Sequence, residues 1–385
     1  MKAIRNGRLI CPAADGHFHV IENHVLVYDQ QIVSILPVPA FHPELAETVL
    51  DAAGAYVSPG FINVHIHGCG GYDTMDDTPE ALRVIRQKQT ESGVTSLLPT
   101  TMTYDFPTIY RALDRIRQAM QGGDGAAVLG CHMEGPFISE SRKGAQAARD
   151  IARADFSKIE PYKDVIRIIT LAPEELADDC FIRACRENGI VVSMGHSSAD
   201  YDTACRAIKV WGITHVTHLF NGMAPFHHRT PGIVGAALDT DVNCELITDN
   251  IHSHPAAQRM VFHAKGGEHI ILVTDSMRAC MLGSGVSELG GQKVYVEGQK
   301  ATLADGTIAG SVLTMDRALA NYARNTGISV PAAVETVTRT PALELGIYGE
   351  RGAIEVGKRA DLVIFDEQLQ IMATFIAGKI VYKRQ

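Results

Sequence analysis

The sequence predicts an α/β protein: a (β/α)8 TIM-type barrel with a small β-sandwich domain built from both chain ends. Short runs rich in Val, Ile and Leu recur through the middle of the chain, as in strands buried on both faces, and helical segments separate most of them. Eight such units over about 285 residues fit a barrel of this kind, which typically has about 250. The two ends instead alternate short apolar and polar runs. We therefore expect 1–56 and 348–385 to form the small domain and 57–347 to form the barrel.

The composition is that of a globular protein without a general affinity for polyanions. The chain has 385 residues, 46% hydrophobic and 21% charged, with a formal net charge of -9. This balance does not favour binding to nucleic acid or to an acidic membrane surface. The eight cysteines contain no Cys-x-x-Cys pair, and no apolar run approaches the roughly 20 residues of a membrane span. We expect reduced thiols, no signal peptide and a cytoplasmic location.

The expected elements follow the chain in order. The N-terminal segment has short strands around Ala3-Ile4, Val25–Val27 and Ile32–Leu36. A first helix has Thr78 as N-cap and Pro79 at its first position, and it stops at Gly93. A second helix is capped by Asp105, buries Ile109, Leu113, Ile116 and Met120, and ends at Gly122-Gly123.

The barrel strands are expected at 59–66, 94–101, 127–133, 165–171, 190–194, 213–219, 244–248 and 269–274. After them, 283–308 has the pattern of an inserted β-hairpin. One helix ends at Gly327 and another begins at Pro331. Short strands at 361–365, 374–377 and 379–382 complete the small domain.

A histidine pair at the end of the first barrel strand is the first sign of chemistry. His65 and His67 lie two apart on a strand, so both imidazoles point to the same face. A glycine-rich turn follows, which leaves room for a ligand. Two neutral imidazoles on one face begin a divalent metal site. The pair His17 and His19 has the same spacing but lies among polar residues, and we interpret it as a solvated strand face.

Other strand ends supply the same residue types, and active groups in such barrels gather at the C-terminal ends of the strands. They carry Glu134, His196, His218 and Asp275. His132 lies two residues before Glu134 on the same face and is an alternative ligand. His215 precedes His218 by three residues, so we expect it to be packed behind the site. Asp275 is either a ligand or a general base for water, and the strand does not decide between them.

The motifs at these strand ends resemble the amidohydrolase superfamily, and within it the deacetylases of N-acetylated hexosamine 6-phosphates. The resemblance covers essentially the whole chain. The matching stretches are Pro59–Gly68, Leu98–Thr101, His132–Phe137, Lys143–Gln146, Gly195–Ser197, Thr217–Met223, His227–Gly232, Asp249–His252, Val273–Ser276, Ala309–Met315 and Gly357–Val363.

The resemblance implies hydrolysis of the acetamide of N-acetylglucosamine 6-phosphate, with one or two divalent ions per subunit, Zn or Fe being expected. It implies Glu134, His196 and His218 for the main ion, His65 and His67 for a second, and Asp275 as base and then acid. It implies a homodimer in which Arg229 reaches the neighbouring site. The implied substrate contacts are Ala145 and Gln146 for the sugar, Asn221, Gly222, Arg229 and His252 for the phosphate, and Ile308, Ala309 and Gly310 for the acetyl end.

Three positions depart from the family pattern. Asn63 replaces a usual aspartate before the histidine pair, Gln146 a frequent histidine, and Thr230 a usual glutamate. The last two leave an N-acetylgalactosamine 6-phosphate substrate open. A cyclic-amide hydrolase of the superfamily would carry a lysine on the fourth strand, and 165–173 has none. A non-catalytic relative would have lost ligands, whereas every ligand position here is filled.

Overall fold

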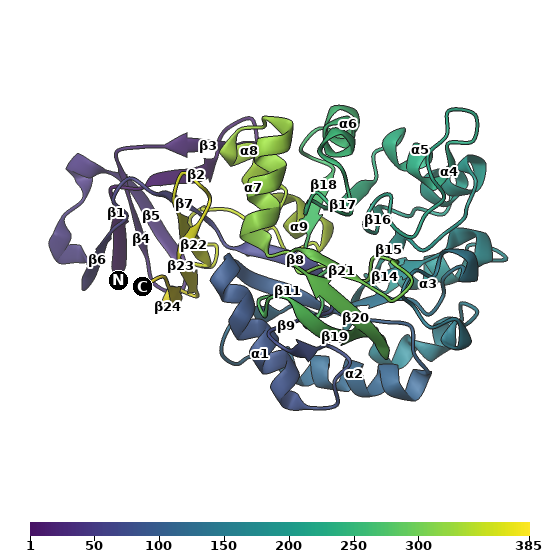
Figure 1. The fold of residues 1–385 in the computed structure, drawn as a ribbon. Coiled ribbons are helices and arrows are strands. Elements are labelled where there is room, and N and C mark those ends of the chain that lie inside the picture. The colour runs from purple at the N-terminus through teal and green to yellow at the C-terminus, as the bar shows by residue number, and fades with distance from the viewer.

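The centre of the molecule is a barrel of parallel strands (Figure 1). The computed structural model describes residues 1–385, apart from the side chain of Leu45. Seven neighbouring pairs form a continuous ladder, and the barrel closes through a bridge between Ile66 and Ser276. The strands are β8 (Phe61–Ile66), β11 (Val94–Thr101), β13 (Cys131–Glu134), β14 (Ile166–Leu171), β15 (Val191–Met194), β16 (His215–Val216), β17 (Asn243–Ile247) and β18 (Ile270–Val273). The predicted fold class is confirmed.

The strands form here because their residues are buried on both faces. Every residue of β8, β11 and β18 is buried. The predicted strand 127–133 divides into β12 (Ala127–Val128) and β13 at Gly130, whose φ is +144°. β16 is much shorter than the predicted strand 213–219, because the chain turns out of the sheet before His218.

Helices cover the outside of the barrel (Figure 1). Thr78 caps α1 (Pro79–Gln89) by accepting a hydrogen bond from the backbone N–H of Glu80, and a 3-10 turn then leads to Gly93. Asp105 caps α2 (Phe106–Ala119), which ends before Gly122-Gly123. The other helices are α3 (Cys180–Glu187), α4 (Tyr201–Lys209), α5 (Gly232–Leu238), α6 (Pro255–Lys265), α7 (Met315–Thr326), α8 (Val330–Glu335) and α9 (Arg339–Glu344). In the part of the chain that the structure describes, none of them could span a membrane.

Two sheets at one side of the barrel contain both chain ends (Figure 1). One has the order β5-β4-β1-β6 and the other β24-β23-β22-β7-β2-β3, so β22 to β24 from the C-terminal segment pair with N-terminal strands. Their bounds are β1 (Lys2–Arg5), β2 (Arg8–Pro12), β3 (Phe18–Ile21), β4 (His24–Tyr28), β5 (Ile32–Pro37), β6 (Thr48–Asp51), β7 (Tyr56–Pro59), β22 (Leu362–Phe365), β23 (Ile371–Ile376) and β24 (Lys379–Lys383). These sheets share a separate apolar core. The domain limits 1–56, 57–347 and 348–385 stay a prediction.

Small strands extend the barrel at its open end. β9 (Gly68–Cys69) and β10 (Tyr72–Asp73) follow the first barrel strand. The insert at 283–308 has three strands rather than a simple hairpin, namely β19 (Gly285–Leu289), β20 (Gln292–Glu297) and β21 (Lys300–Thr302). Leu289 from this insert reaches the cavity described below. Far from that cavity, His19 is exposed, and the half-buried His17 contacts Glu268 and Glu335.

Candidate metal centre and active site

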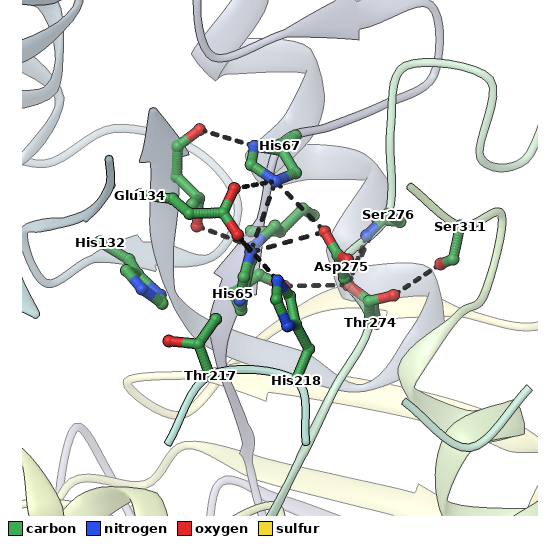
Figure 2. Close-up of polar contacts among 12 residues, drawn as sticks. His65, His67, His132, Glu134, Thr217, His218, Thr274, Asp275, Ser276 and Ser311 are labelled. Atoms are coloured by element: carbon green, nitrogen blue, oxygen red, sulfur yellow. Dashed lines mark hydrogen bonds and ion pairs between the residues drawn. The ribbon is translucent and has the colours of Figure 1, made fainter. Parts of the chain in front are cut away.

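The predicted ligand side chains converge at the C-terminal end of the barrel. Figure 2 shows His65, His67, Glu134, His218 and Asp275 pointing toward one another from four different strand ends. They lie beside or below a cavity of about 310 Å³, which the loops after the barrel strands surround. The side chains converge because the parallel strands of a barrel carry their C-terminal ends to one edge.

The Glu134 carboxylate is the centre of the cluster. Its Oε1 lies 3.0 Å from His196 Nε2 and 3.0 Å from His218 Nε2, and those two nitrogens are 3.2 Å apart. Its Oε2 lies 3.3 Å from His67 Nε2. The carboxylate therefore faces both histidine groups.

A second group adjoins the first through Glu134. His65 Nε2 and His67 Nε2 are 3.4 Å apart. Asp275 Oδ1 lies 3.5 Å from His65 Nε2 and 3.2 Å from His67 Nε2. Asp275 thus borders the His65–His67 pair and lines the cavity, where a reacting group can reach it.

The ring orientations fit a bound cation. His65 Nδ1, His67 Nδ1 and His196 Nδ1 each lie within hydrogen-bond distance of an acceptor outside the cluster: Glu245 at 2.8 Å, the Thr100 carbonyl at 3.2 Å and the Arg142 carbonyl at 2.8 Å. A proton on Nδ1 leaves the Nε2 lone pair free to face the cluster, as in carboxylate–histidine–metal arrangements.

The distances between the Nε2 atoms also fit a bound cation. Ligands of a tetrahedral ion with bonds of about 2.0–2.1 Å lie about 3.3 Å from one another. The nitrogens in both histidine pairs are separated by 3.2 and 3.4 Å. Nitrogen lone pairs facing each other at this distance repel unless a proton or a cation lies between them. Glu134, His196 and His218 form one candidate ligand set, and His65, His67 and Glu134 form the other.

The backbone at three of these residues is in the left-handed region. His196 has a φ of 47°, His218 of 28° and Asp275 of 47°. Non-glycine residues rarely adopt such values, and they cluster at functional sites where the fold enforces them. Each of these residues lies two positions after the end of its strand, where the backbone turns at the mouth of the barrel.

Electrostatics keep the two carboxylates ionised. Burial raises the pKa of Glu134, but the imidazoles of His196, His218 and His67 outweigh it and hold the pKa well below its usual range. Burial also raises the pKa of Asp275, and His65, His67 and His218 outweigh it and lower the pKa. Ionised carboxylates are what a cation site and a general base both require.

Two further histidines lie behind the cluster. His132 has Nδ1 3.0 Å from the Val64 carbonyl and Nε2 2.7 Å from Thr170 Oγ1, so its ring is held away from the cavity. Burial and the neighbouring His65 lower the pKa of His132 to about 3, so the ring is neutral. His215 is fully buried, as predicted, with Nε2 3.1 Å from Glu245 Oε1.

Sequence reasoning missed Glu245, a buried carboxylate that lies beneath the candidate metal ligands. It lies in β17 with no exposed surface and contacts His65 and His215. The available signal was a carboxylate inside the apolar run Cys244–Ile247. Asn63, where the family pattern has an aspartate, does not contact the His65 ring; its side chain donates to Thr274 Oγ1 at 2.8 Å.

Most of the residues expected to bind substrate line the cavity. These are Ala145, Gln146, Asn221, Gly222, His252, Ile308 and Gly310. Gly222 has a φ of 61°, and a Cβ there would lie 2.9 Å from His196 Nδ1, so the loop can approach the ring only with glycine. Ala309 is fully buried and does not line the cavity. Arg229 is exposed and lies outside the cavity of its own chain.

Gln146, which lines the cavity, also contacts the candidate metal centre. Its Nε2 donates to Glu134 Oε2 at 2.7 Å, and its Oε1 accepts from the Thr103 backbone N–H at 2.6 Å. Both ends of the amide are therefore engaged within the protein, and only 2% of the residue is exposed. The side chain fixes the Glu134 carboxylate from the side opposite His196.

His252 is also held in place by a carboxylate. Its Nδ1 lies 2.6 Å from Asp249 Oδ2, and Asp249 Oδ1 accepts the backbone N–H groups of Ile251 and His252. Nε2 of His252 is therefore free at the wall of the cavity, which Asn221 and Gly222 also line. When both ring nitrogens carry protons, this imidazole can donate from Nε2 to an anion in the cavity while Nδ1 donates to Asp249.

The model of the amidohydrolase family matches residues 56–381, which is most of the chain. The protein belongs to the amidohydrolase family. The N-acetylglucosamine-6-phosphate deacetylase of Bacillus subtilis is 41% identical over 86% of this chain and 85% of its own length. The N-acetylgalactosamine-6-phosphate deacetylase of Escherichia coli O157:H7 is 35% identical over 94% of this chain and 95% of its own length.

Solved amidohydrolase structures share the fold along the entire chain. The N-acetylglucosamine-6-phosphate deacetylase of Pasteurella multocida has a TM-score of 0.92 and 31% sequence identity, covering 100% of both chains. The amidohydrolase fold predicted from the strand-end motifs is therefore confirmed.

Proposed function

We propose that this protein is a metal-dependent deacetylase that hydrolyses N-acetyl-D-glucosamine 6-phosphate to D-glucosamine 6-phosphate and acetate. The observation that carries the proposal is the convergence of four imidazole Nε2 atoms on Glu134, beside the ionised Asp275, at the edge of a cavity. The names of the similar deacetylases support the choice of substrate. Because a galactosamine enzyme is also similar, N-acetylgalactosamine 6-phosphate is the second candidate.

In this proposal, Glu134, His196 and His218 hold one divalent ion, and His65 and His67 hold a second. Zn or Fe suits a site of imidazole and carboxylate ligands. When bound, such an ion supplies Lewis-acid polarisation of a carbonyl oxygen and lowers the pKa of water toward 7. The other steps depend on residues of the chain itself.

Asp275 moves the proton. Its Oδ1 accepts a proton from the attacking water as the new C–O bond forms at the acetyl carbon. It then donates that proton to the amide nitrogen as the C–N bond breaks, so acetate and the amine leave. The low pKa of Asp275 keeps it ready as a base before the water attacks.

The remaining cavity residues orient the sugar. Ile308 and Gly310 border the acetyl end, and Ala145 borders the sugar. Asn221, Gly222 and His252 line the part of the cavity that we assign to the 6-phosphate, whose binding energy positions the distant amide. We assign the enzyme to a reducing cytoplasm, which the unpaired state of all eight cysteines supports.

Acetate release tests this function. Purified protein with Zn²⁺ or Fe²⁺ is expected to release acetate from N-acetylglucosamine 6-phosphate with a higher kcat/KM than from N-acetylgalactosamine 6-phosphate or unphosphorylated N-acetylglucosamine. The reverse order of the two sugar phosphates would make the galactosamine derivative the substrate. No acetate from either one would refute the proposed function.

The Arg229→Ala variant tests the phosphate contact and the proposed homodimer. Arg229 is exposed and outside its own cavity, which supports a role in the neighbouring subunit's site. A dianionic phosphate favours a bidentate guanidinium. We expect KM for the phosphorylated sugar to rise about tenfold or more, as for a lost hydrogen bond to a charged group. KM for the unphosphorylated sugar should hardly change, and Arg183→Ala, which removes another exposed arginine, should change neither.

Mixing Arg229→Ala with Asp275→Asn subunits tests whether the contact crosses the dimer. In a mixed dimer, one site has its own Asp275 and borrows Arg229 from the other chain. Partial recovery of the low KM is therefore expected. If dimers with exchanged subunits show no recovery, Arg229 acts within its own chain or not at all.

A further inference from the structure

Glu245 is a buried carboxylate directly beneath the candidate metal centre. It lies in the middle of β17, and none of its surface is exposed. It does not line the cavity, so substrate cannot reach it. A carboxylate in such a place is costly unless it is fully hydrogen-bonded, and an apolar residue would fill a barrel interior at lower cost. Its contacts therefore need a functional explanation.

The two carboxylate oxygens lie within hydrogen-bond distance of three separate groups, and Oε1 also lies 3.6 Å from His132 Nδ1. Oε2 lies 2.8 Å from His65 Nδ1 and accepts the backbone N–H of His218 at 3.1 Å. Oε1 lies 3.1 Å from His215 Nε2. One side chain thus connects β8, the turn after β16 and β17 at the level just below the ligand atoms.

Each contact to a candidate ligand has a consequence for metal binding. The contact at His65 favours the proton on Nδ1, so that the Nε2 lone pair faces the cluster. The contact at His218 involves the backbone of a residue whose φ is 28°. Glu245 stabilises this sparsely populated conformation, which places the His218 ring beside Glu134. His65 and His218 belong to different candidate ligand sets.

We propose that Glu245 is a positioning residue for both metal positions, acting through the His65 ring and the His218 backbone. The inference rests on the metal-dependent function proposed above. It adds a single buried carboxylate that prepares the two sites together, so its loss weakens ion binding at both. Ligand-orienting partners of this kind typically contribute 10- to 100-fold in metal affinity.

The test is a Zn²⁺ titration of the full-length protein after removal of bound metal, with a chromophoric chelator as competitor. The Glu245→Gln variant keeps the size of the side chain, but its amide cannot accept from His65, His215 and the His218 N–H together. We expect its Kd for Zn²⁺ to rise about 10-fold or more relative to wild type, for every ion that the wild type binds. kcat for acetate release should fall when Zn²⁺ is limiting and recover in part at high Zn²⁺.

Glu344→Gln is the matched control. Glu344 lies 3.4 Å from the other nitrogen of His215, and it contacts none of the candidate metal ligands. The Glu344→Gln substitution perturbs the buried His215 ring from the side opposite Glu245. We expect its Kd for Zn²⁺ to stay within about twofold of wild type, even if its melting temperature falls. An equal loss in both variants would assign the effect to the His215 network and overturn the proposal.

A second variant guards against misfolding of Glu245→Gln. Glu245→Asp keeps the negative charge opposite His215 but is one methylene shorter, so it cannot contact His65 and His218 at the distances seen here. The same rise in Kd is expected, with a folded circular dichroism spectrum. A folded Glu245 variant that binds Zn²⁺ like wild type would overturn the positioning role while leaving the proposed function intact. If the wild type itself binds no Zn²⁺ or Fe²⁺, the metal-dependent function fails first.

Discussion

Replacing Asp275 with asparagine is expected to lower kcat for acetate release by about a hundredfold or more and to leave the metal content unchanged. The amide cannot take the proton from water, although it fills the same space. The fold should tolerate the change, because the φ of 47° at this position suits asparagine as well as aspartate. The backbone contacts that fix the residue, Asp275 N–H to His65 and Ser311 N–H to Asp275, do not involve the side chain.

The measurement is single-turnover and steady-state acetate release, paired with elemental analysis of the same preparation. The metal content decides between the two roles that the sequence left open for Asp275. Its Oδ1 lies 3.2 Å from His67 Nε2, close enough to share an ion with that imidazole. Loss of metal together with activity would make Asp275 a ligand first, and its assignment as the base would be wrong.

Removal of the metal is expected to abolish activity, and Zn²⁺ or Fe²⁺ should restore it. The acetamide is a poor electrophile, and the titratable groups that line the cavity are carboxylates and imidazoles, with no lysine or arginine among them. Polarisation of the carbonyl therefore falls to a bound cation. Elemental analysis of metal-replete protein should give two ions per chain, because both histidine pairs are complete.

A stoichiometry of one ion or less under metal-replete conditions would contradict the two-ion version. Full activity after chelation, with no metal found in the assayed sample, would contradict metal dependence altogether. Circular dichroism before and after chelation controls for loss of the fold. We expect the fold to survive removal of the ions, because the barrel strands pack through their own apolar core.

The fold and the centre of the site were predictable because their signals are local in the sequence. Buried strands such as 94–101 are continuous apolar runs, and helix caps such as Thr78 and Asp105 mark where helices begin. The C-terminal ends of barrel strands share one edge. The convergence of Glu134, His196 and Asp275 could therefore be predicted without knowing which strands pair with one another.

The contacts beneath the centre were not predictable, because they join residues far apart in the chain. Glu245 contacts His65, which lies 180 residues away in the sequence, and no local sequence pattern indicates this contact. The resemblance implied a sugar contact for Gln146, and its hydrogen bond to Glu134 could not be read from the sequence. β16 was expected to run to Leu219 and ends at Val216, because His218 and Phe220 both have positive φ. Strain of this kind is set by tertiary contacts and leaves no periodic signal.

An anomalous-difference map from crystals of the metal-replete protein tests the central claim most directly. The account predicts one peak among Glu134, His196 and His218 and a second beside His65 and His67, in protein that releases acetate from N-acetylglucosamine 6-phosphate. An active crystal batch with no anomalous peak in this cluster, or with its only metal bound elsewhere, would contradict the account.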